Sequence, residues 1–289
     1  MKVKIIGACT DFGVDINGTS DGPGEIIKKI DKKNDVILIE KPDNIKETDK
    51  NNLKKNLNTV NTFNKKLFNE IVNCINNECF PITIGGDHSI AIGSTLASNY
   101  ANEKIGVIWV DAHLDYNTFE TTISGNLHGL PLAAINGICK ELTPFTDKFV
   151  NPDNCAIVGY RAKEDNSDLE IANIKKMGVH VFTTNDIKEY GVQNIMNKAI
   201  EIAKKNTNGI HVSYDLDFID PKDAPGVSVP ETDGPNLEIA YDVKDIIINN
   251  LNLIKSFDLV EYNPHFDIDN KTRNIAVKIL NDIVENIEK

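Results

Sequence analysis

Three residues with metal-binding side chains lie close together near the middle of the sequence. Asp111, His113 and Asp115 follow the apolar run 107–110, each two residues after the last. If the extended conformation of that run continues through them, alternate side chains point the same way and all three converge. Carboxylate oxygens together with an imidazole suit a divalent ion such as Mn²⁺. The polar end of an exposed strand is the plain alternative.

A second pair of carboxylates closes the apolar run 210–216. Asp215 and Asp217 are again two residues apart, so an extended backbone would place both side chains on one face and Leu216 on the other. Helix capping or a turn is the alternative for such aspartates. We assign that alternative to Asp220, which precedes a proline, and keep the other two as candidate ligands.

A histidine follows the apolar run 82–84, within the segment G-G-D-H-S. We interpret His88 as a metal ligand and Asp87 as a residue that orients a ligand, although a histidine held at a helix N-terminus is an alternative. The candidate ligands are then His88, Asp111, His113, Asp115, Asp215 and Asp217. Four aspartates and two histidines suit two ions that share carboxylates, and the set holds no thiolate of the kind common in structural zinc sites.

The elements that must position these side chains alternate between strand and helix patterns. Strand-like runs lie at 3–8, 36–39, 82–84, 105–110, 155–160, 179–183, 210–216 and 257–262. Helical patterns lie at 50–79, 89–100, 167–177, 191–206, 236–250 and 270–287. This alternation predicts an α/β fold with a parallel sheet of about eight strands and helices on both faces, in one domain over 1–289. The carboxyl ends of parallel strands share one edge, so the polar clusters should meet there.

The composition argues against several classes of protein. The formal net charge is −12, and an acidic protein repels phosphate, so we expect neither nucleic acid nor a membrane as a partner. A small cationic substrate is compatible with that charge. The five cysteines are odd in number and lack C-x-x-C spacing, which predicts free thiols in a reducing cytoplasm.

Several motifs resemble those of one enzyme family, the ureohydrolases, which include arginase, agmatinase and formimidoylglutamase. The similar segments are G-G-D-H-S at 85–89, D-A-H-L-D at 111–115, S-Y-D-L-D-F-I-D-P at 213–221, G-T-S-D-G-P at 18–23 and V-E-Y-N-P at 260–264. The resemblance spans roughly residues 5 to 280. It implies a three-layer α/β/α fold with an eight-stranded parallel sheet. It also implies an enzyme that hydrolyses a guanidino or formimidoyl C–N bond with two Mn²⁺ ions.

The resemblance further implies a role for each candidate residue. His88 and Asp115 are expected to be terminal ligands of one ion, and His113 and Asp217 terminal ligands of the other. Asp111 and Asp215 are expected to bridge the two ions. Asp115, His128 and Glu261 are then the catalytic residues. His128 would carry a proton to the leaving amine, and Glu261 would pair with the guanidinium. For His128 the alternative role is a hydrogen bond to metal-bound water. For Glu261 it is an ion pair at the end of a strand.

The stretch from Asn117 to His128 indicates the substrate. S-G-N-L-H-G with an upstream asparagine closely resembles the arginase loop that holds the amino-acid end of arginine. The resemblance assigns substrate binding to Asn117, Ser124 and Asn126, whose amide and hydroxyl donors, without a cation, suit a zwitterion. A capped loop, in which Ser124 and Asn126 bond to backbone groups, is the alternative.

Two departures limit the arginase prediction. Glu164 stands where arginases have an aspartate that contacts the α-amino group, and Ala162 replaces another acid, as in agmatinases and formimidoylglutamases. Val229 stands where a threonine would line the arginase pocket. Glu231 and Asp233 follow, and no physical role for them is apparent from the sequence.

Hydrolysis of L-arginine to ornithine and urea is therefore the expected reaction, with the guanidino compound as a small cationic substrate. Agmatine is the first alternative substrate, but it lacks an α-carboxylate for the loop to hold. Formimidoylglutamate is the next alternative, and a non-catalytic metal-binding protein is the last. The resemblance also suggests a homo-oligomer, either a trimer or a hexamer.

Overall fold

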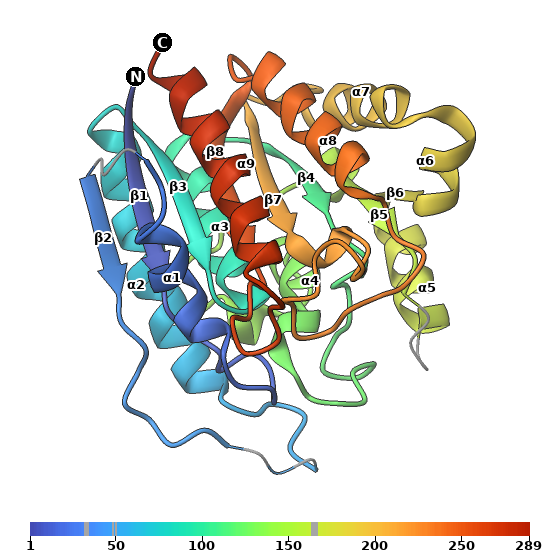
Figure 1. Ribbon diagram of the computed structural model, residues 1–289. Helices are drawn as coiled ribbons and strands as arrows, with labels where there is room; N and C mark the ends of the chain where they lie inside the picture. Colours follow the sequence, from blue (N-terminus) through green and yellow to red (C-terminus); the bar gives the residue numbers. More distant parts are fainter. Residues whose placement is uncertain (32–34, 48, 50, 163–166) are drawn as a thin grey trace.

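The sheet can be followed in a computed structural model that describes residues 1–31, 35–47, 49, 51–162 and 167–289 (Figure 1). Its strands are β1 (Lys2–Ala8), β2 (Asp35–Ile39), β3 (Cys79–Gly85), β4 (Gly106–Val110), β5 (Cys155–Tyr160), β6 (His180–Thr183), β7 (Ile210–Asp215) and β8 (Ile254–Val260). They pair in parallel in the order β2-β1-β3-β8-β7-β4-β5-β6. The predicted fold, an eight-stranded parallel sheet in an α/β protein, is confirmed.

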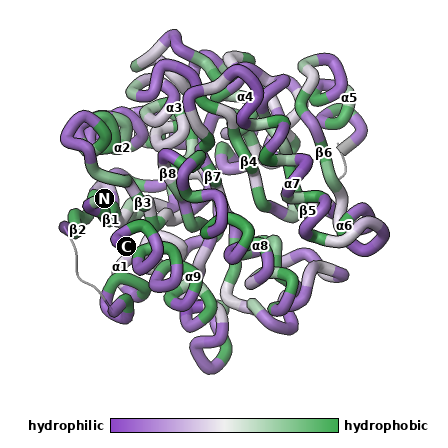
Figure 2. The backbone as a smooth tube through the Cα atoms, turned by 90° about the horizontal axis from the view of Figure 1, so that it is seen from above, coloured by the Kyte–Doolittle hydropathy of each residue, from purple (hydrophilic) through white to green (hydrophobic). Residues whose placement is uncertain are grey.

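Helices cover both faces of this sheet. They are α1 (Gly22–Ile27), α2 (Leu57–Asn76), α3 (Ala91–Ala101), α4 (Pro131–Ile135), α5 (Ser167–Met177), α6 (Thr184–Tyr190), α7 (Val192–Ala203), α8 (Leu237–Asn249) and α9 (Lys271–Ile287). Helices α2 to α5 pack on one face, and α1 with α6 to α9 pack on the other (Figure 2). The three-layer arrangement follows, because neither face of the sheet is left to solvent.

Strand β4 shows why the strand patterns are apolar without alternation. Ile108 and Val110 belong to the core beneath α7, α8 and α9, whereas Val107 and Trp109 belong to the core beneath α2, α3 and α4. Every residue of β4 is buried. A strand covered on both faces needs apolar side chains at consecutive positions, as predicted for a parallel sheet.

Three short helices were not predicted from the sequence. Helices α1, α4 and α6 have 6, 5 and 7 residues, too few to show an apolar repeat at helical spacing. The predicted helix 50–79 begins only at Leu57, because Asn56 before it adopts a left-handed backbone with φ 58°. A local signal for α6 does exist, since Thr183 and Asp186 form a reciprocal capping box.

The four central strands, β3, β8, β7 and β4, are neighbours in the sheet although they are far apart in the sequence. The segments that follow them carry the candidate ligands and Glu261. Because all strands are parallel, those four segments emerge side by side at one edge (Figure 1). The fold thus provides the convergence that the sequence predicted.

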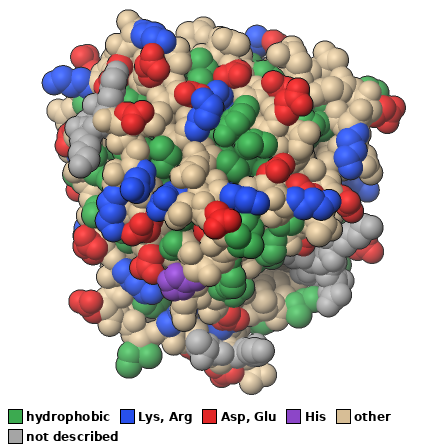
Figure 3. Space-filling model, viewed as in Figure 1, with side chains coloured by type: hydrophobic (Ala, Val, Ile, Leu, Met, Phe, Trp, Pro, Cys, Tyr) green, Lys and Arg blue, Asp and Glu red, His purple; other side chains and the backbone are tan. Residues whose placement is uncertain are grey.

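The surface of the molecule carries charges of both signs. On the face shown in Figure 3, acidic and basic side chains are interspersed, and small apolar patches lie between them. All five cysteines are free. In the part of the chain that the structure describes, no helix combines the length and the apolar character needed to cross a membrane.

A buried polar network joins β7, β8 and α3 inside the core. Nδ1 of His211 lies 2.7 Å from the Ser256 hydroxyl, and its Nε2 lies 3.1 Å from the Asp258 carboxylate. The Ser94 hydroxyl donates to the same carboxylate, and the Ser256 hydroxyl donates to Ser98 at 2.7 Å. All five residues are buried, so each member depends on the others for its hydrogen bonds.

We therefore expect His211→Phe to destabilise the fold. The substitution leaves the buried Asp258 carboxylate without its imidazole partner, a loss that costs about 3 to 5 kcal/mol in comparable buried pairs. The free energy of unfolding, measured by urea denaturation, should fall by that amount. His180→Phe is the matched control, because His180 is exposed on β6, and it should change stability by less than about 0.5 kcal/mol. Equal stability of the two variants would contradict the role of the network.

Candidate metal centre

The backbone after β4 does not follow the predicted path. The strand ends at Val110, and the expected extended conformation from Asp111 to Asp115 is wrong. The amide of His113 donates to Oδ1 of Asp111 at 2.6 Å, which turns the chain, and Asp115 has a left-handed backbone with φ 50°. A bend, not a strand, therefore brings the three side chains together.

Strands β7 and β8 end one and two residues earlier in the sequence than predicted. Within the predicted strand 210–216, the observed strand β7 ends at Asp215. Oδ1 of Asp215 accepts the amide N–H of Asp217 at 2.7 Å and caps a short 3-10 turn. The run 257–262 leaves its strand at Val260, because Glu261 has a left-handed backbone with φ 66°. Non-glycine residues in this region are uncommon and gather at functional sites.

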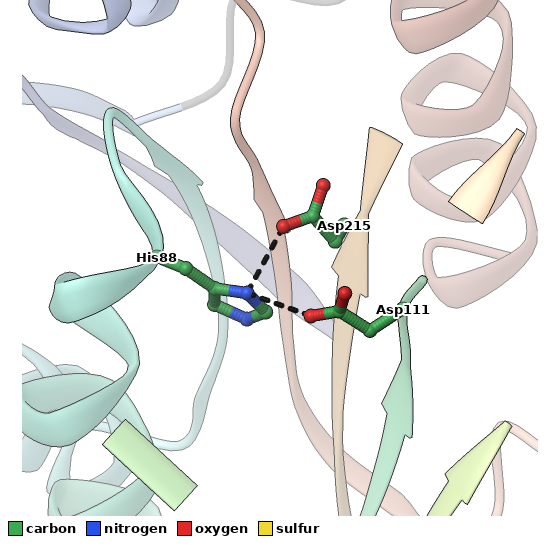
Figure 4. Close-up of side chains that lie close together, drawn as sticks. All are labelled: His88, Asp111 and Asp215. Atoms are coloured by element: carbon green, nitrogen blue, oxygen red, sulfur yellow. Dashed lines mark ion pairs between the residues drawn. The ribbon is translucent and has the colours of Figure 1, made fainter. Parts of the chain in front are cut away.

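Three carboxylates surround one ring nitrogen of His88. Nδ1 of His88 lies 3.0 Å from Oδ2 of Asp111, 3.0 Å from Oδ2 of Asp215 and 3.1 Å from Oδ2 of Asp115. Figure 4 shows His88, Asp111 and Asp215 pointing toward one another from three different segments. This nitrogen is buried and has no hydrogen-bond partner among the residues that the structure describes, which is the arrangement expected of atoms that share a cation.

A second group of ligand atoms adjoins the first. Nδ1 of His113 lies 2.8 Å from Oδ2 of Asp217 and 3.5 Å from Oδ1 of Asp111. Asp111 thus presents one oxygen to each histidine and belongs to both groups. The carboxylate of Asp215 lies with His88 alone among these contacts, so a bridging role for Asp215 stays a prediction.

The charges in this cluster call for a cation. Burial would lower the pKa of His88, but the nearby carboxylates of Asp111, Asp115 and Asp215 raise it well above the ordinary value. Burial, followed by the charges of Asp217 and Asp111, raises the pKa of the Asp215 carboxyl. Several carboxylates forced together in the interior repel one another, and divalent ions would remove that repulsion. The donor set of carboxylates and imidazoles therefore fits two such ions.

Neighbouring side chains hold these ligands in place. The His88 ring stacks on Trp109 with centroids 4.1 Å apart, and its Nε2 lies 2.9 Å from the Ser213 hydroxyl. The indole N–H of Trp109 donates to Oδ2 of Asp111 at 2.9 Å. Asp87 accepts the amide N–H of Ser89 at 3.0 Å and caps the turn that begins at His88. Such contacts fix the orientation of a ligand before metal binds.

Glu261 connects the candidate metal centre to His128. One carboxylate oxygen, Oε1, accepts the amide N–H of His88 at 2.7 Å and lies 3.0 Å from Nδ1 of His128. The other oxygen, Oε2, is buried and has no hydrogen-bond partner in the described part of the chain. Burial would lower the pKa of His128, but the hydrogen bond and charge of Glu261 raise it to about 9. Val229 lines the same cavity as both residues.

Comparisons with known proteins agree with this geometry. Residues 1–285 match the Arginase family. The chain belongs to the arginase family. The arginase of Brevibacillus brevis is 34% identical over 98% of this chain and 97% of its own length. The crystal structure of arginase from Bacillus subtilis has a TM-score of 0.85 at 32% identity, over 98% of both chains. That of Entamoeba histolytica arginase in complex with L-ornithine has a TM-score of 0.87 at 29% identity, over 98% of both chains.

The resemblance drawn from the motifs is thus confirmed, as is the class of enzyme, a metal-dependent ureohydrolase. The arginase family implies a binuclear metal site, and the described residues contain two groups of candidate ligands that share Asp111. The identity of the ions belongs to the proposal below.

The residues of the predicted substrate loop lie at different depths. Asn117 is buried, accepts the Thr121 hydroxyl at 2.9 Å, and lines a small cavity beside the metal ligands. Ser124 is exposed, and its hydroxyl accepts the amide N–H of Asn126 at 3.2 Å. Asn126 is half-buried. The predicted substrate residue Glu164 lies outside the described residues.

Two acidic residues near the metal ligands were missed or left unexplained by the sequence. Glu170 of α5 is buried, accepts the amide N–H of Tyr116 at 3.2 Å, and lines the cavity that Asn117 also lines. The sequence does contain a pattern that predicts its position. Glu170 lies four residues before the buried Ile174 and therefore shares the inward face of its helix. Charged residues on such a face are rarely there for packing alone.

Glu231 lies beside the second histidine. Its Oε1 is 3.8 Å from Nε2 of His113, and the nearby imidazole holds the pKa of Glu231 below its ordinary value. Arg161 fastens this segment, because its guanidinium donates to the carbonyl oxygens of Glu231, Thr232 and Asp217 at 2.8, 3.1 and 2.8 Å. Glu231 is thus placed to orient the imidazole whose other nitrogen faces Asp217.

We expect Glu231→Gln to weaken one of two metal-binding events. Loss of a carboxylate behind a ligating histidine typically costs 10- to 100-fold in metal affinity, so the dissociation constant for one Mn²⁺ ion should rise about tenfold. Isothermal titration of the metal-free protein with Mn²⁺ measures both events. Asp233→Asn is the matched control, because Asp233 is an exposed carboxylate two residues away. An equal effect of both substitutions would refute the contact with His113 as the cause.

Proposed function

We propose that this chain is an arginase that hydrolyses L-arginine to L-ornithine and urea with two Mn²⁺ ions. The cavity beside the candidate metal centre carries this proposal, because His113 and Asp115 share it with Asn117 and Glu170. Glu170 offers a carboxylate for an α-ammonium group, and Asn117 offers an amide for the amino-acid end. Arginine fits this arrangement, because its guanidino group can lie at the metal ligands while its amino-acid end lies in the cavity beside them.

The metal ions in this proposal would be held by His88, Asp111, His113, Asp115, Asp215 and Asp217. Mn²⁺ is favoured by carboxylate and imidazole ligands and by the absence of thiolates among them. Two divalent ions, when bound, supply a strong nucleophile at neutral pH and Lewis acidity toward the reacting carbon. The protein residues around them must then orient the substrate and supply the proton.

Glu261 and His128 are suited to those two tasks. The free oxygen of Glu261, Oε2, can accept an N–H from the guanidinium and turn its carbon toward the ligands. His128 holds a proton at neutral pH, since its pKa is raised to about 9. When the C–N bond breaks, the departing amine takes up a proton, and the His128 imidazolium can deliver it. Asp115 would contribute to catalysis as a metal ligand, and it lines the same cavity as His128 and Glu261.

Ser124 and Asn126, which lie nearer the surface than Asn117, are proposed to bind the α-carboxylate. We call the loops around the proposed substrate the rim. Agmatine remains the principal alternative substrate, and one observation favours it. Ala162 and Val229, which replace polar residues expected in arginases, both line cavities beside the metal ligands and offer no hydrogen bond. We rank arginine first because agmatine keeps the ammonium group but lacks the α-carboxylate that Ser124 and Asn126 are proposed to bind.

A substrate comparison tests this proposal directly. The protein loaded with Mn²⁺ is assayed with arginine, agmatine, guanidinobutyrate and formimidoylglutamate, and urea or formamide release is measured. We expect kcat/KM for arginine to exceed that for agmatine by about 100-fold, because agmatine lacks the α-carboxylate that Ser124 and Asn126 are proposed to bind. Faster turnover of agmatine would reject arginine as the substrate and leave the family assignment intact.

A second test addresses His128. We expect His128→Asn to lower kcat for arginine by about 100-fold or more, the usual contribution of a general acid. Two-site binding of Mn²⁺ should persist in the variant, because the six proposed ligands are unchanged. A kcat within threefold of the wild-type value would show that another group supplies the proton.

We also propose that the protein works in the cytoplasm and forms a homo-oligomer, as a trimer or a hexamer. The free cysteines support a reducing compartment. Family membership supports the oligomer.

A further inference from the structure

Lys55 is a buried cation beside the proposed substrate loop. Its side chain is 2% exposed. The ammonium group, Nζ, lies 2.8 Å from both carboxylate oxygens of Asp15 and donates to Oδ1 of Asn126 at 3.1 Å. The sequence indicated a loop whose donors act without a cation, and this contact corrects that interpretation.

The contact decides which way the Asn126 amide faces. An ammonium group has only donors, so the atom that it contacts must be the amide oxygen. The amide nitrogen, Nδ2, then points away from Lys55, and it has no hydrogen-bond partner in the described ranges of the chain. An asparagine side chain without such a neighbour can present either end to a ligand. Lys55 therefore fixes Asn126 as a hydrogen-bond donor.

The loop is docked tightly on the segment that carries Lys55. Gly125 has a left-handed backbone with φ 70°, and a Cβ there would lie 2.7 Å from the carbonyl oxygen of Asn52 and 2.9 Å from Cα of Leu53. The ammonium group of Lys54 lies 4.5 Å from the centre of the Phe119 ring. Only a glycine allows this close approach, so the position of the loop depends on the segment 52–55.

The segment that carries Asp15 is tied to the same loop. The amide of His128 donates to the carbonyl oxygen of Gly13 at 3.0 Å, two residues before Asp15. Asp15 is 36% exposed and neutralises the buried ammonium, so the pair adds little net charge to the rim. The effect of Lys55 on a ligand must therefore act through the orientation of Asn126.

We propose that Lys55, held by Asp15, presets the Asn126 amide as a donor for the α-carboxylate of the substrate and thereby favours an amino acid over its decarboxylated analogue. This inference rests on the proposed function of the loop. Lys55 is a positioning residue, because it acts through Asn126. The ligand class that it selects is an α-amino-acid carboxylate.

Substitution of Lys55 by methionine tests the proposal, because methionine is similarly long and cannot donate. In Lys55→Met we expect the KM for arginine to rise about tenfold, the usual effect of one lost hydrogen bond to a charged group. The kcat should stay within twofold, because the reacting atoms are not touched. Titration calorimetry should show a similar loss of affinity for L-ornithine, whereas affinity for putrescine, which has no carboxylate, should not change.

Two further variants serve as controls. Lys65→Met removes an exposed lysine of α2, and its affinity for ornithine should equal that of the wild type. Asp15→Asn combined with Lys55→Met removes the ion pair as a neutral unit. This double variant should lose affinity for L-ornithine but not for putrescine, as the single variant does. It replaces the single variant in the test if an unpaired Asp15 prevents folding.

The outcomes separate this inference from the proposed function. Failure of the wild-type protein to hydrolyse arginine rejects the proposed substrate, and the comparison of ornithine with putrescine still decides the role of Lys55. Equal losses of ornithine and putrescine affinity would show that Lys55 only supports folding, which overturns the inference. Unchanged ornithine affinity in a folded variant overturns it as well.

Discussion

The carboxylate of Asp111 lies between two buried imidazoles, and much of the structure serves to keep it there. One oxygen faces His88 at 3.0 Å and the other faces His113 at 3.5 Å. A single rigid group that contacts both histidines sets the distance between the two ligand groups. The indole of Trp109, two residues earlier on β4, donates to one of the oxygens and stacks on the His88 ring. The buried strand thus fixes one imidazole and the shared carboxylate together.

Concentrating so many carboxylates in the interior opposes folding, because each loses its hydration and repels the next. The parallel sheet supplies what offsets this cost. The carboxyl ends of β3, β8, β7 and β4 bring free backbone N–H groups to the same edge, and those of His113 and Asp217 are taken up by the neighbouring carboxylates of Asp111 and Asp215. The turns that end the strands and the ligands that face the ions are therefore the same residues.

The sequence sufficed for the fold and for the residues that meet at this edge, because apolar strands and the parallel topology depend on local patterns. The conformation after each strand could not be predicted. Asp115 and Glu261 adopt a left-handed backbone that only tertiary contacts stabilise. Glu170 and Lys55 were missed as site residues for a related reason. Each reaches the site from a segment distant from the motifs, and a single sequence does not show which helix face or loop contacts another segment.

The candidate metal centre and the rim that surrounds the substrate are built from different parts of the chain. The ligands come from strand ends, whose positions the sheet fixes, whereas the rim comes from loops tied together by single contacts such as Lys55 with Asn126. A charged side chain at the rim can therefore be supplied by one segment or by another without disturbing the metal ligands. Ala162 lacks the acid expected there, while Glu170 brings a carboxylate to the same cavity from α5. Because the ligand oxygens are already committed to the imidazoles and to backbone N–H groups, a change of substrate within this fold has to come from the rim.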